Sequence, residues 1–271
     1  MINNILNKFS LKNKKVFIIG GCGLIGSSIS EAILSASAEL YVLDNDKKRG
    51  NYLQKKFRNF KFKYIYYDLS SINTFDKRFK NIIKKYGCPN VFINCSYPTT
   101  RDWKNSNFDK NKISILRKNI DIHLNTHSWI SYSMCEIMKK NKIKGSVILF
   151  GSIYGIVGQS TNLYKKTNLR ENMNYSIIKG GLITLTKQLA SYYGQSGIRV
   201  NIICPGGIEG NVKGKKIKQP LNFMKNYSKQ SPLRRLGKPE EIAPSALFLS
   251  SEASSYITGT IFLVDGGWTS I

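Results

Sequence analysis

Tyr175 and Lys179 lie four residues apart and could together perform acid–base chemistry. In a helix this spacing places both side chains on one face. A free phenol, with a pKa of about 10, is a poor acid–base catalyst at neutral pH, and a neighbouring ammonium lowers that pKa toward the working range. Ser152 follows an apolar segment upstream and could hydrogen-bond the reacting oxygen. The pair alone also fits a solvated helix surface, but with Ser152 it predicts proton transfer at an alcohol or a carbonyl.

A glycine-rich segment near the start of the chain is typical of a phosphate-binding loop. Gly20, Gly23 and Gly26 recur at intervals of three between a predicted strand and a predicted helix. Glycines in this setting permit a tight turn and let backbone amides approach a pyrophosphate at the helix N-terminus. Because such a pattern is informative only between a strand and a helix, its position here favours a dinucleotide site.

An acidic residue after the second predicted strand favours NAD as the dinucleotide. The Asp44 carboxylate could accept hydrogen bonds from both adenosine ribose hydroxyls and repel a 2′-phosphate. Alternatively, Asp44 is a turn residue in the segment Asp44-Asn45-Asp46. Three basic residues at positions 47–49 could bind a 2′-phosphate, which leaves NADP open.

Short apolar segments alternate with longer helical patterns along the chain. The predicted strands are Lys15–Ile19, Glu39–Leu43, Lys63–Tyr67, Val91–Asn94, Ser146–Phe150, Arg199–Ile203 and Thr260–Val264. The predicted helices are Ile25–Ser35, Ile72–Lys85, Ser114–Lys140, Tyr175–Tyr193 and Pro239–Leu249. Continuous apolar strands are typical of a parallel sheet with helices on both faces, where ligands bind at the carboxyl ends of the strands. We therefore expect one doubly wound α/β domain over residues 1–271.

The charge of the chain is strongly positive, with 42 Lys and Arg against 16 Asp and Glu and a formal net charge of +26. Such a charge fits either an anionic partner or the solvated surface of a compositionally biased protein. The lysines are spread along the whole chain without a zinc-finger or RNA-recognition signature, so we do not expect nucleic-acid binding as the main function. A hydrophobic content of 41% excludes a wholly disordered chain.

The cysteines and the apolar runs argue against several other classes of protein. The cysteines are scattered: Cys22, Cys88, Cys95, Cys135 and Cys204. Without a C-x-x-C pair they indicate neither a zinc site nor a disulfide framework, and they fit a reducing cytoplasm. The longest apolar runs are far shorter than the ~20 residues of a membrane span, and Met1–Phe9 lacks a signal peptide's apolar centre. We expect a cytoplasmic protein that does not interact with membranes.

These motifs together resemble the short-chain dehydrogenase/reductase family, and the resemblance covers nearly the whole chain. It is carried by Ile19–Gly26, Asp68-Leu69, Ser152–Gly155, Tyr175 with Lys179, Arg199–Asn201, Cys204–Ile208, Pro232–Ile242, Tyr256–Gly259 and Val264–Gly267. It implies a Rossmann fold with about seven parallel strands and an NAD(P)-dependent oxidoreductase acting on CH–OH groups. It also implies that Tyr175 transfers the alcohol proton, Lys179 tunes it and holds the nicotinamide ribose, and Ser152 polarises the carbonyl.

The resemblance also assigns the cofactor-binding residues. They are Gly20, Gly23, Leu24, Ile25, Gly26, Asp44, Asn45, Asp68, Leu69, Asn94, Cys95, Ser96, Tyr175, Lys179, Pro205, Gly206, Gly207 and Ile208. Asp68 matches the carboxylate that lies near the adenine in the family. The segment Asn94-Cys95-Ser96-Tyr97 keeps only the first residue of the family's N-N-A-G.

Three features depart from the family pattern. His123 stands at the place of the helical Asn that completes the catalytic tetrad, with Asn125 two residues away. A histidine there could hold a relay water as a catalytic residue, or could simply line the core. Gly210 replaces a threonine that steadies the nicotinamide amide, and the segment between Ser152 and Tyr175 is longer than is usual. His123 and His127 are spaced as metal ligands can be, but no acidic or cysteine ligand completes a site, so no metal is expected.

Three long polar segments should overhang the carboxyl edge of the sheet: Tyr97–Ile113, Ile153–Asn174 and Gly206–Lys238. Their basic residues are Arg101, Lys104, Lys110, Lys165, Lys166, Arg170, Lys213, Lys215, Lys216 and Lys218. Because few acids offset them, the mouth of the site should attract an anion. Four aromatic residues could stack on a sugar or a base: Tyr97, Trp103, Tyr154 and Tyr164.

The substrate prediction follows from these segments. Asn94–Pro98 and Gly151–Gly155, with the long stretch before Tyr175, look like oxidoreductases from bacterial flagellin-modification and surface-sugar clusters. We expect a phosphorylated, nucleotide-linked or acidic sugar as the small-molecule substrate. A neutral ketone or alcohol, or a 3-oxoacyl substrate, is the alternative if the lysines only solvate the surface.

Two function classes other than an enzyme also remain open. A non-catalytic dinucleotide-binding protein on the same fold would usually lose Tyr175 or Lys179. A nucleic-acid binder would show affinity with a steep salt dependence. The family resemblance further implies a homodimer or homotetramer packed through the helices around residues 114–140 and 175–193.

Overall fold

One parallel sheet organises the computed structural model, which describes residues 5–70, 74–210 and 219–271. In these residues the strands lie in the order β3-β2-β1-β4-β5-β6-β7, and all are parallel. The strands are β1 (Lys15–Ile19), β2 (Glu39–Asp44), β3 (Phe62–Tyr66), β4 (Val91–Asn94), β5 (Ser146–Phe150), β6 (Arg199–Pro205) and β7 (Ile261–Val264). The strand order reverses between β1 and β4, so the ligand crevice of such a sheet lies at their carboxyl ends. The expected doubly wound Rossmann fold is confirmed.

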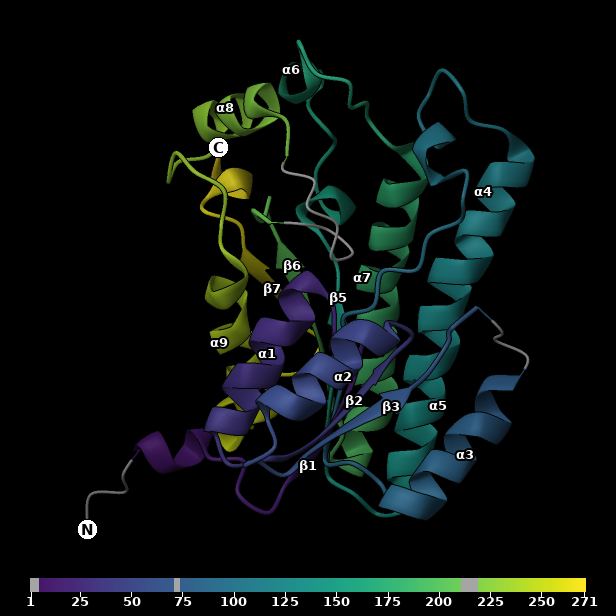
Figure 1. The fold of residues 1–271 in the computed structure, drawn as a ribbon, viewed down its shortest axis with the longest axis vertical. Coiled ribbons are helices and arrows are strands. Elements are labelled where there is room, and N and C mark those ends of the chain that lie inside the picture. Colours follow the sequence, from purple (N-terminus) through teal and green to yellow (C-terminus); the bar gives the residue numbers. More distant parts are fainter. Residues whose placement is uncertain (1–4, 71–73, 211–218) are drawn as a thin grey trace.

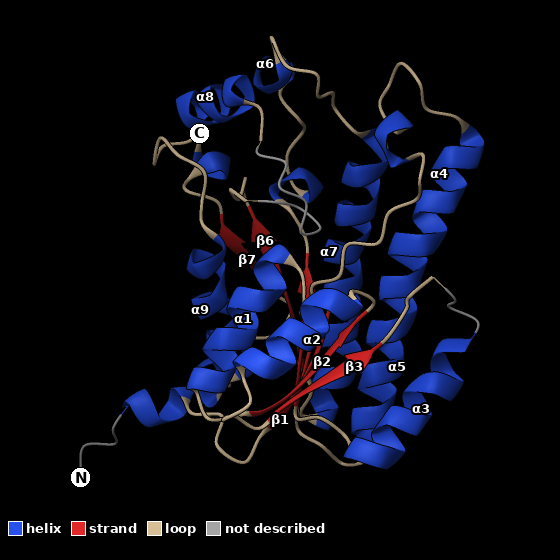
Figure 2. Ribbon diagram, viewed as in Figure 1, coloured by secondary structure: helices blue, strands red, loops and turns tan. Residues whose placement is uncertain are grey.

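Helices cover both faces of the sheet (Figures 1 and 2). One face carries α1 (Leu24–Ser35), α2 (Lys47–Lys56) and α9 (Pro239–Ser250). The other carries α3 (Phe75–Tyr86), α5 (Thr126–Lys140) and α7 (Met173–Tyr193), with α4 (Ile113–Asn119) leading into α5. Two short helices, α6 (Thr161–Tyr164) and α8 (Leu221–Gln230), lie beyond the sheet at the top of Figure 1.

Short segments of other helix types complete the chain. The 3-10 helices are Ile5–Phe9, Trp103–Asn105, Ile153–Gly155, Gly194–Ser196, Glu252–Ser254 and Trp268–Ser270. A π-helical segment, Ile120–Asn125, joins α4 to α5. π-helical turns are rare overall but occur frequently at functional sites. This segment is therefore an unusual part of the helix, at the place where the helix passes the edge of the sheet.

The strands are apolar throughout because successive side chains enter two different cores. In β1, Phe17 and Ile19 pack with α3, α5 and α7, where Phe79 is fully buried. Val16 and Ile18 of the same strand point to the opposite face, toward α1 and α9. The two cores hold the sheet from both sides, and the residues at its carboxyl edge are fixed by that packing.

The predicted strands agree with the structure to within one or two residues, and β1, β4 and β5 have the predicted bounds. The predicted helix Ser114–Lys140 is instead α4, a π-segment and α5 in succession. Helix α3 is described from Phe75; Ile72, where it was predicted to begin, lies outside the described residues.

Three helices, α2, α6 and α8, were not predicted. Helix α2 has little apolar sequence and contains Gly50, yet this glycine is buried because the Tyr64 ring occupies the space a Cβ would need, with 2.2 Å between them. Periodicity cannot show a helix that packs through a glycine. Of the helices in the described ranges, none is long and apolar enough to cross a membrane.

Candidate active site

The carboxyl edge of β5 brings Ser152 next to helix α7, which carries Tyr175 and Lys179. Ser152 caps a 3-10 helix, and its Oγ accepts a hydrogen bond from the Tyr154 amide at 3.2 Å. Lys179 is only 3% exposed and its Nζ donates to the Phe150 carbonyl at 2.9 Å. The same Nζ lies 5.7 Å from the centre of the Tyr175 ring. The three predicted catalytic residues therefore come together at one point.

Local features of the chain fix this group. Asn172 is the N-cap of α7, and its Oδ1 accepts from the Tyr175 amide at 2.9 Å. Gly155 lies against the backbone of α7, and a Cβ there would be 2.7 Å from the Lys179 carbonyl carbon. The chain after Ser152 can therefore approach α7 only because residue 155 has no side chain.

Burial dominates the acid–base properties of the pair. Burial raises the pKa of Tyr175, and a hydrogen bond with Ser152 opposes that rise. The expectation that the ammonium lowers the pKa of Tyr175 is thus wrong for the protein alone. Burial lowers the pKa of Lys179 itself from 10.5 to about 8, and this ammonium donates to the Phe150 carbonyl. Burial, and not the ammonium, therefore sets the direction in which the pKa of Tyr175 shifts.

His123 lies in the π-helical segment and packs against Tyr97 and His127. Its imidazole is fully buried, and its ring centre lies 5.4 Å from that of Tyr97 and 4.6 Å from that of His127. Burial lowers the pKa of His123 well below its usual value, with His127 and Lys179 adding to the effect, so the ring is neutral at neutral pH. Asn125, the other candidate for this place, is exposed and donates to Asp121 Oδ1 at 3.2 Å.

The glycine loop has the close backbone contacts that a phosphate cradle requires. Gly20 has φ +81°, and a Cβ there would lie 2.6 Å from the Ser96 backbone. A Cβ at Gly26 would lie 2.2 Å from the Gly20 carbonyl oxygen. Gly23 precedes α1 as its N-cap, with Leu24 and Ile25 in the first turn. The loop therefore leaves backbone amides at the start of α1 able to meet a pyrophosphate.

The predicted ribose-binding carboxylate lies beside this loop. Asp44 ends β2; its Oδ2 accepts from the Cys22 amide and its Oδ1 from the Asp46 amide, each at 3.0 Å. Burial raises the pKa of Asp44, and the two amide hydrogen bonds oppose that rise. Asn45 beside it is exposed. After β3, Asp68 Oδ1 accepts from the Ser70 amide at 2.9 Å. Asp44 is thus a fixed part of the loop and not only a turn residue.

The segments after β4 and β6 form the rest of this edge. Cys95 Sγ donates to the Ile19 carbonyl at 3.3 Å, which joins the segment after β4 to the glycine loop. The Gly207 amide donates to Tyr227 Oη at 2.6 Å. Gly210 has φ +130°, and a Cβ there would lie 2.7 Å from Leu24 Cδ1. In this conformation the position does not accept the threonine that the family has there.

Two residues that join distant segments near this edge, Gln159 and Tyr227, were not predicted from the sequence. Gln159 Oε1 accepts from the Asn172 amide, and its Nε2 donates to the Asn172 carbonyl, so it ties the long segment to the start of α7. Tyr227 of α8 stacks on Trp268 with ring centres 4.4 Å apart. Both act between segments distant along the chain, and neither belongs to a short motif.

The aromatic residues predicted to stack on a substrate lie in two different places. The ring centres of Tyr97, Trp103 and Tyr154 lie 6.0, 6.3 and 6.4 Å from that of Tyr175. Tyr164 instead packs near Phe223 of α8. The first three form a wall around the Tyr175 ring, and Tyr164 belongs to the outer rim of this edge.

That rim contains an open hollow of about 350 Å³. Its lining residues are Asp109, Thr161, Tyr164, Lys165, Lys166, Arg170 and Glu171. Three basic side chains face two acidic ones, which leaves a small excess of positive charge. The predicted contributions of Lys213, Lys215, Lys216 and Lys218 lie outside the described residues.

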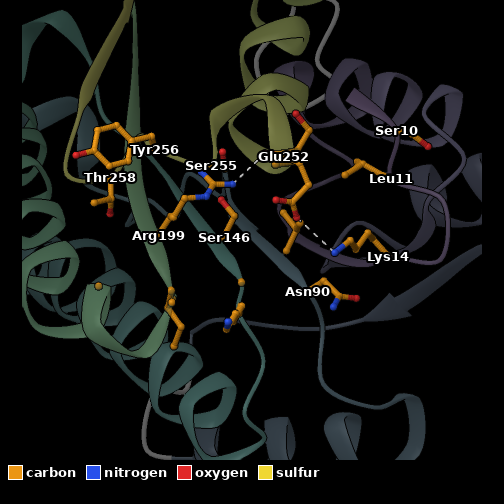
Figure 3. Close-up of a pocket in the computed structure, with 18 residues that line it drawn as sticks. Ser10, Leu11, Lys14, Asn90, Ser146, Arg199, Glu252, Ser255, Tyr256 and Thr258 are labelled. Carbon is orange, nitrogen blue, oxygen red and sulfur yellow. Dashed lines mark hydrogen bonds and ion pairs between the residues drawn. The ribbon is translucent and has the colours of Figure 1, made fainter. Parts of the chain in front are cut away.

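A second cavity, of about 550 Å³, lies at the opposite edge of the sheet (Figure 3). Its wall includes Asn90, Ser146 and Arg199, at the amino ends of β4, β5 and β6. Arg199 donates to the carbonyls of Leu249 and Ser251, so its guanidinium serves the end of α9. This cavity is remote from Tyr175. Within the described ranges, no group of three or more His, Cys, Asp or Glu could hold a metal ion.

The chain is similar to known proteins over nearly all of its length. A family model described as enoyl-(acyl carrier protein) reductase matches residues 23–269. A post-translational flagellin modification protein A of Campylobacter coli is 27% identical over 95% of this chain and 99% of its own. A sorbose reductase of Candida albicans is 29% identical over 98% of this chain and 91% of its own. A short-chain dehydrogenase from Leptospira borgpetersenii, solved with bound NAD+, is 30% identical with a TM-score of 0.83, covering 99% of this chain and 97% of that one. With Ser152, Tyr175 and Lys179 at the carboxyl edge of a parallel sheet, these similarities show that the chain belongs to the short-chain dehydrogenase/reductase family of oxidoreductases.

Proposed function

We propose that this protein is an NAD-dependent dehydrogenase or reductase of an anionic or nucleotide-linked sugar, acting in the biosynthesis of surface or flagellin glycans. One observation supports the reaction class: Ser152, Tyr175 and the buried Lys179 lie together beside the glycine loop. The proposal includes a cytoplasmic location and a homodimer or homotetramer. Large side chains exposed on α5 and α7, Trp129, Tyr132, Ile177 and Tyr192, support that assembly.

The glycine loop and Asp44 fit a bound dinucleotide. Close backbone packing at Gly20 and Gly26 leaves no space for side chains where a pyrophosphate would approach. Asp44 presents a carboxylate beside the loop, at the distance along the chain where a ribose partner is expected. The neighbour from Leptospira, solved with NAD+, supports the same assignment. When bound, the nicotinamide supplies or accepts the hydride.

The side chains at the edge provide the proton chemistry. Tyr175 Oη donates a proton to the carbonyl oxygen during reduction and removes it from the alcohol during oxidation. Ser152 donates a hydrogen bond to the same oxygen and orients the substrate. Lys179 Nζ would hold the nicotinamide ribose, and its charge would then act near the phenol of Tyr175. His123, neutral and buried behind Tyr97, is the fourth catalytic residue in this proposal, where it holds a relay water.

Tyr175→Phe removes the reacting oxygen and keeps the ring. Turnover should fall by about a thousandfold, because positioned general acid–base groups contribute about 10²–10⁴. The dissociation constant for NAD should stay within a few-fold, since the glycine loop, Asp44 and Lys179 are unchanged. Steady-state rates and calorimetry measure the two effects. As a control, the variant should sediment as the same homodimer or homotetramer as the unaltered protein; full activity would contradict the assignment of Tyr175.

Lys179→Met should make the protein more stable while it loses activity. Since folding lowers the pKa of Lys179 from 10.5 to about 8, the unfolded chain binds the extra proton in that window, and stability rises with pH across it. Below pH 8 the full penalty applies, about 3 kcal/mol. The variant also loses the hydrogen bond to the Phe150 carbonyl, which reduces its gain in stability by about 1 kcal/mol.

Urea unfolding at pH 7 should therefore show a gain of about 2 kcal/mol for Lys179→Met, and the gain should shrink as the pH approaches 10.5. Lys187→Met, on the exposed side of the same helix, is the control and should change stability by less than about 0.5 kcal/mol. If Lys179→Met were less stable than the unaltered protein at pH 7, burial of the ammonium would not be destabilising.

NAD should bind more tightly than NADP by about ten- to a hundredfold, because a 2′-phosphate would face the fixed Asp44 carboxylate. Asp44→Asn should reduce this preference, mainly by improving the affinity for NADP. Titration of both cofactors, followed by fluorescence or calorimetry, measures it. Tighter binding of NADP to the unaltered protein would mean that the basic residues at positions 47–49 override Asp44.

The substrate assignment is supported by the outer rim and by two relatives. Lys165, Lys166 and Arg170 line a hollow on the same side as the catalytic phenol. The Campylobacter relative is named for flagellin modification and the Candida relative for sorbose reduction, which favours carbohydrate. The alternative is a neutral ketone, alcohol or 3-oxoacyl substrate, which the description of the matching family model favours.

A substrate panel followed by nicotinamide absorbance separates these alternatives. It should contain nucleotide sugars, sugar phosphates, acidic sugars, neutral ketones and a 3-oxoacyl thioester. We expect turnover of an anionic sugar, with a KM that rises with salt. Turnover confined to neutral ketones or to the thioester, unaffected by ionic strength, would rule out the anionic-sugar assignment.

The double variant Lys165→Gln/Arg170→Gln tests the rim directly. It should raise the KM for the anionic substrate by about tenfold and leave kcat unchanged, because the altered charges lie outside the reacting group. Lys80→Gln/Lys84→Gln on α3 removes the same charge away from the rim and should leave both constants unchanged. Equal effects of the two double variants would assign the salt dependence to the net charge of the molecule.

A further inference from the structure

A hydrogen-bonded chain of side chains links helix α5 to the segment after β4. His127 Nε2 lies 2.9 Å from Ser96 Oγ, and Ser96 Oγ donates to Asn94 Oδ1 at 2.7 Å. His127 and Asn94 are fully buried. The proposed catalytic and cofactor contacts make no use of His127, although it lies one helical turn beyond His123.

The directions of these hydrogen bonds determine the tautomer of His127. The Ser96 backbone amide also donates to Asn94 Oδ1, at 3.3 Å, so the oxygen of this amide group faces Ser96. The Ser96 hydroxyl proton is therefore directed to Asn94, and Ser96 Oγ must accept from the imidazole. His127 accordingly carries its proton on Nε2 and a lone pair on Nδ1.

Ser96 is the point where this chain meets both halves of the site. Its backbone lies 2.6 Å from the place of a Cβ at Gly20, an approach that only a glycine at position 20 allows. The next residue is Tyr97, whose ring centre lies 5.8 Å from Lys179 Nζ and 6.0 Å from the Tyr175 ring centre. A displacement of Ser96 would therefore disturb the glycine loop and the wall beside the catalytic pair together.

We propose that His127 is a positioning residue: through its Nε2–H it fixes Ser96, and so holds the Asn94–Tyr97 segment against the glycine loop on one side and beside Lys179 and Tyr175 on the other. Its effect on turnover rests on the proposed function, whereas its effect on the fold of the segment does not. A neutral donor is suited to this role because a charged imidazole would oppose Lys179.

The surroundings of His127 keep that donor neutral. The ring contacts His123 of the π-helical segment and Ser96 after β4, Ser96 in turn bonds Asn94, and the charge of Lys179 of α7 acts on the ring. Burial, followed by the charge of Lys179, lowers the pKa of His127 to about 3. The same tautomer is therefore expected over the whole range in which the protein is active.

Nitrogen-15 NMR of the histidine rings tests the tautomer directly, and the chain has only two histidines to assign. In the unaltered protein one ring should show a protonated Nε2 and an unprotonated Nδ1, with no change between about pH 8 and pH 5. His127→Gln should remove this set of signals, and Ser96→Ala should make its Nε2 proton exchange faster. A protonated Nδ1, or titration of this ring near pH 6.5, would overturn the proposal.

Variants then test what the hydrogen bond does. His127→Phe keeps a ring without the donor, and Ser96→Ala removes the acceptor. Each should weaken NAD binding and lower kcat/KM by about tenfold, the effect of one lost hydrogen bond. The double variant should be no worse than either single one, because both remove the same interaction. His127→Gln, which retains an amide donor, should recover to within threefold.

Ser131→Ala is the matched control for Ser96→Ala. Ser131 is a fully buried serine on α5 whose Oγ has no hydrogen-bond partner among the described residues. This variant should leave NAD affinity, turnover and the ring signals unchanged. Unaltered NAD affinity in His127→Phe, or equal losses in His127→Phe and His127→Gln, would overturn the positioning role.

Failure of the proposed function gives a different result from failure of this inference. If the unaltered protein bound neither NAD nor NADP in calorimetry, the proposed function would be wrong. The NMR signals and their response to Ser96→Ala would still establish or refute the hydrogen bond from His127.

Discussion

The burial of one ammonium, that of Lys179, is the constraint on which the active edge of this molecule depends. Its Nζ donates to the Phe150 carbonyl, and among the described residues no carboxylate pairs with it. A charge buried in this way is expensive, and the cost appears as a pKa lowered to about 8. Such a group stays in place only if the surrounding structure holds it there. The two cores on either side of the sheet, which fix β5 and α7, supply that support.

Backbone-to-backbone approach is the second element of the same arrangement. Gly20 meets Ser96, Gly26 meets the Gly20 carbonyl, and Gly155 meets the backbone of Lys179, each at a distance that a Cβ would prevent. These contacts bring the glycine loop, the segment after β4 and the catalytic helix within reach of one another. In the proposed function a dinucleotide would contact all three, so the missing side chains would be a condition for binding it.

How far the sequence predicted this site depends on how local each contribution is. Ser152, Tyr175, Lys179 and the glycine loop belong to short segments. The sheet follows from short apolar strands that alternate with helices along the chain. The group of residues and the sheet could therefore both be predicted. His127 with Ser96, or Tyr227 with Gly207, are contacts between segments that only the fold brings together. The rise in the pKa of Tyr175 could not be predicted either, because it arises from burial and not from the neighbouring lysine.

The outer rim, around the hollow lined by Lys165 and Lys166, is held by different interactions from those of the core. Neutral amides hold it: Gln159 contacts the Asn172 backbone, and Asn226 of α8 donates to the carbonyls of Leu163 and Lys165. Each of these hydrogen bonds ends on a backbone carbonyl or amide, so they fix the path of the segment without using its charged side chains. The side chains of Lys165 and Lys166 take no part in them and line the hollow. Substitutions of these lysines can therefore change the charge of the hollow without disturbing the hydrogen bonds that hold the segment.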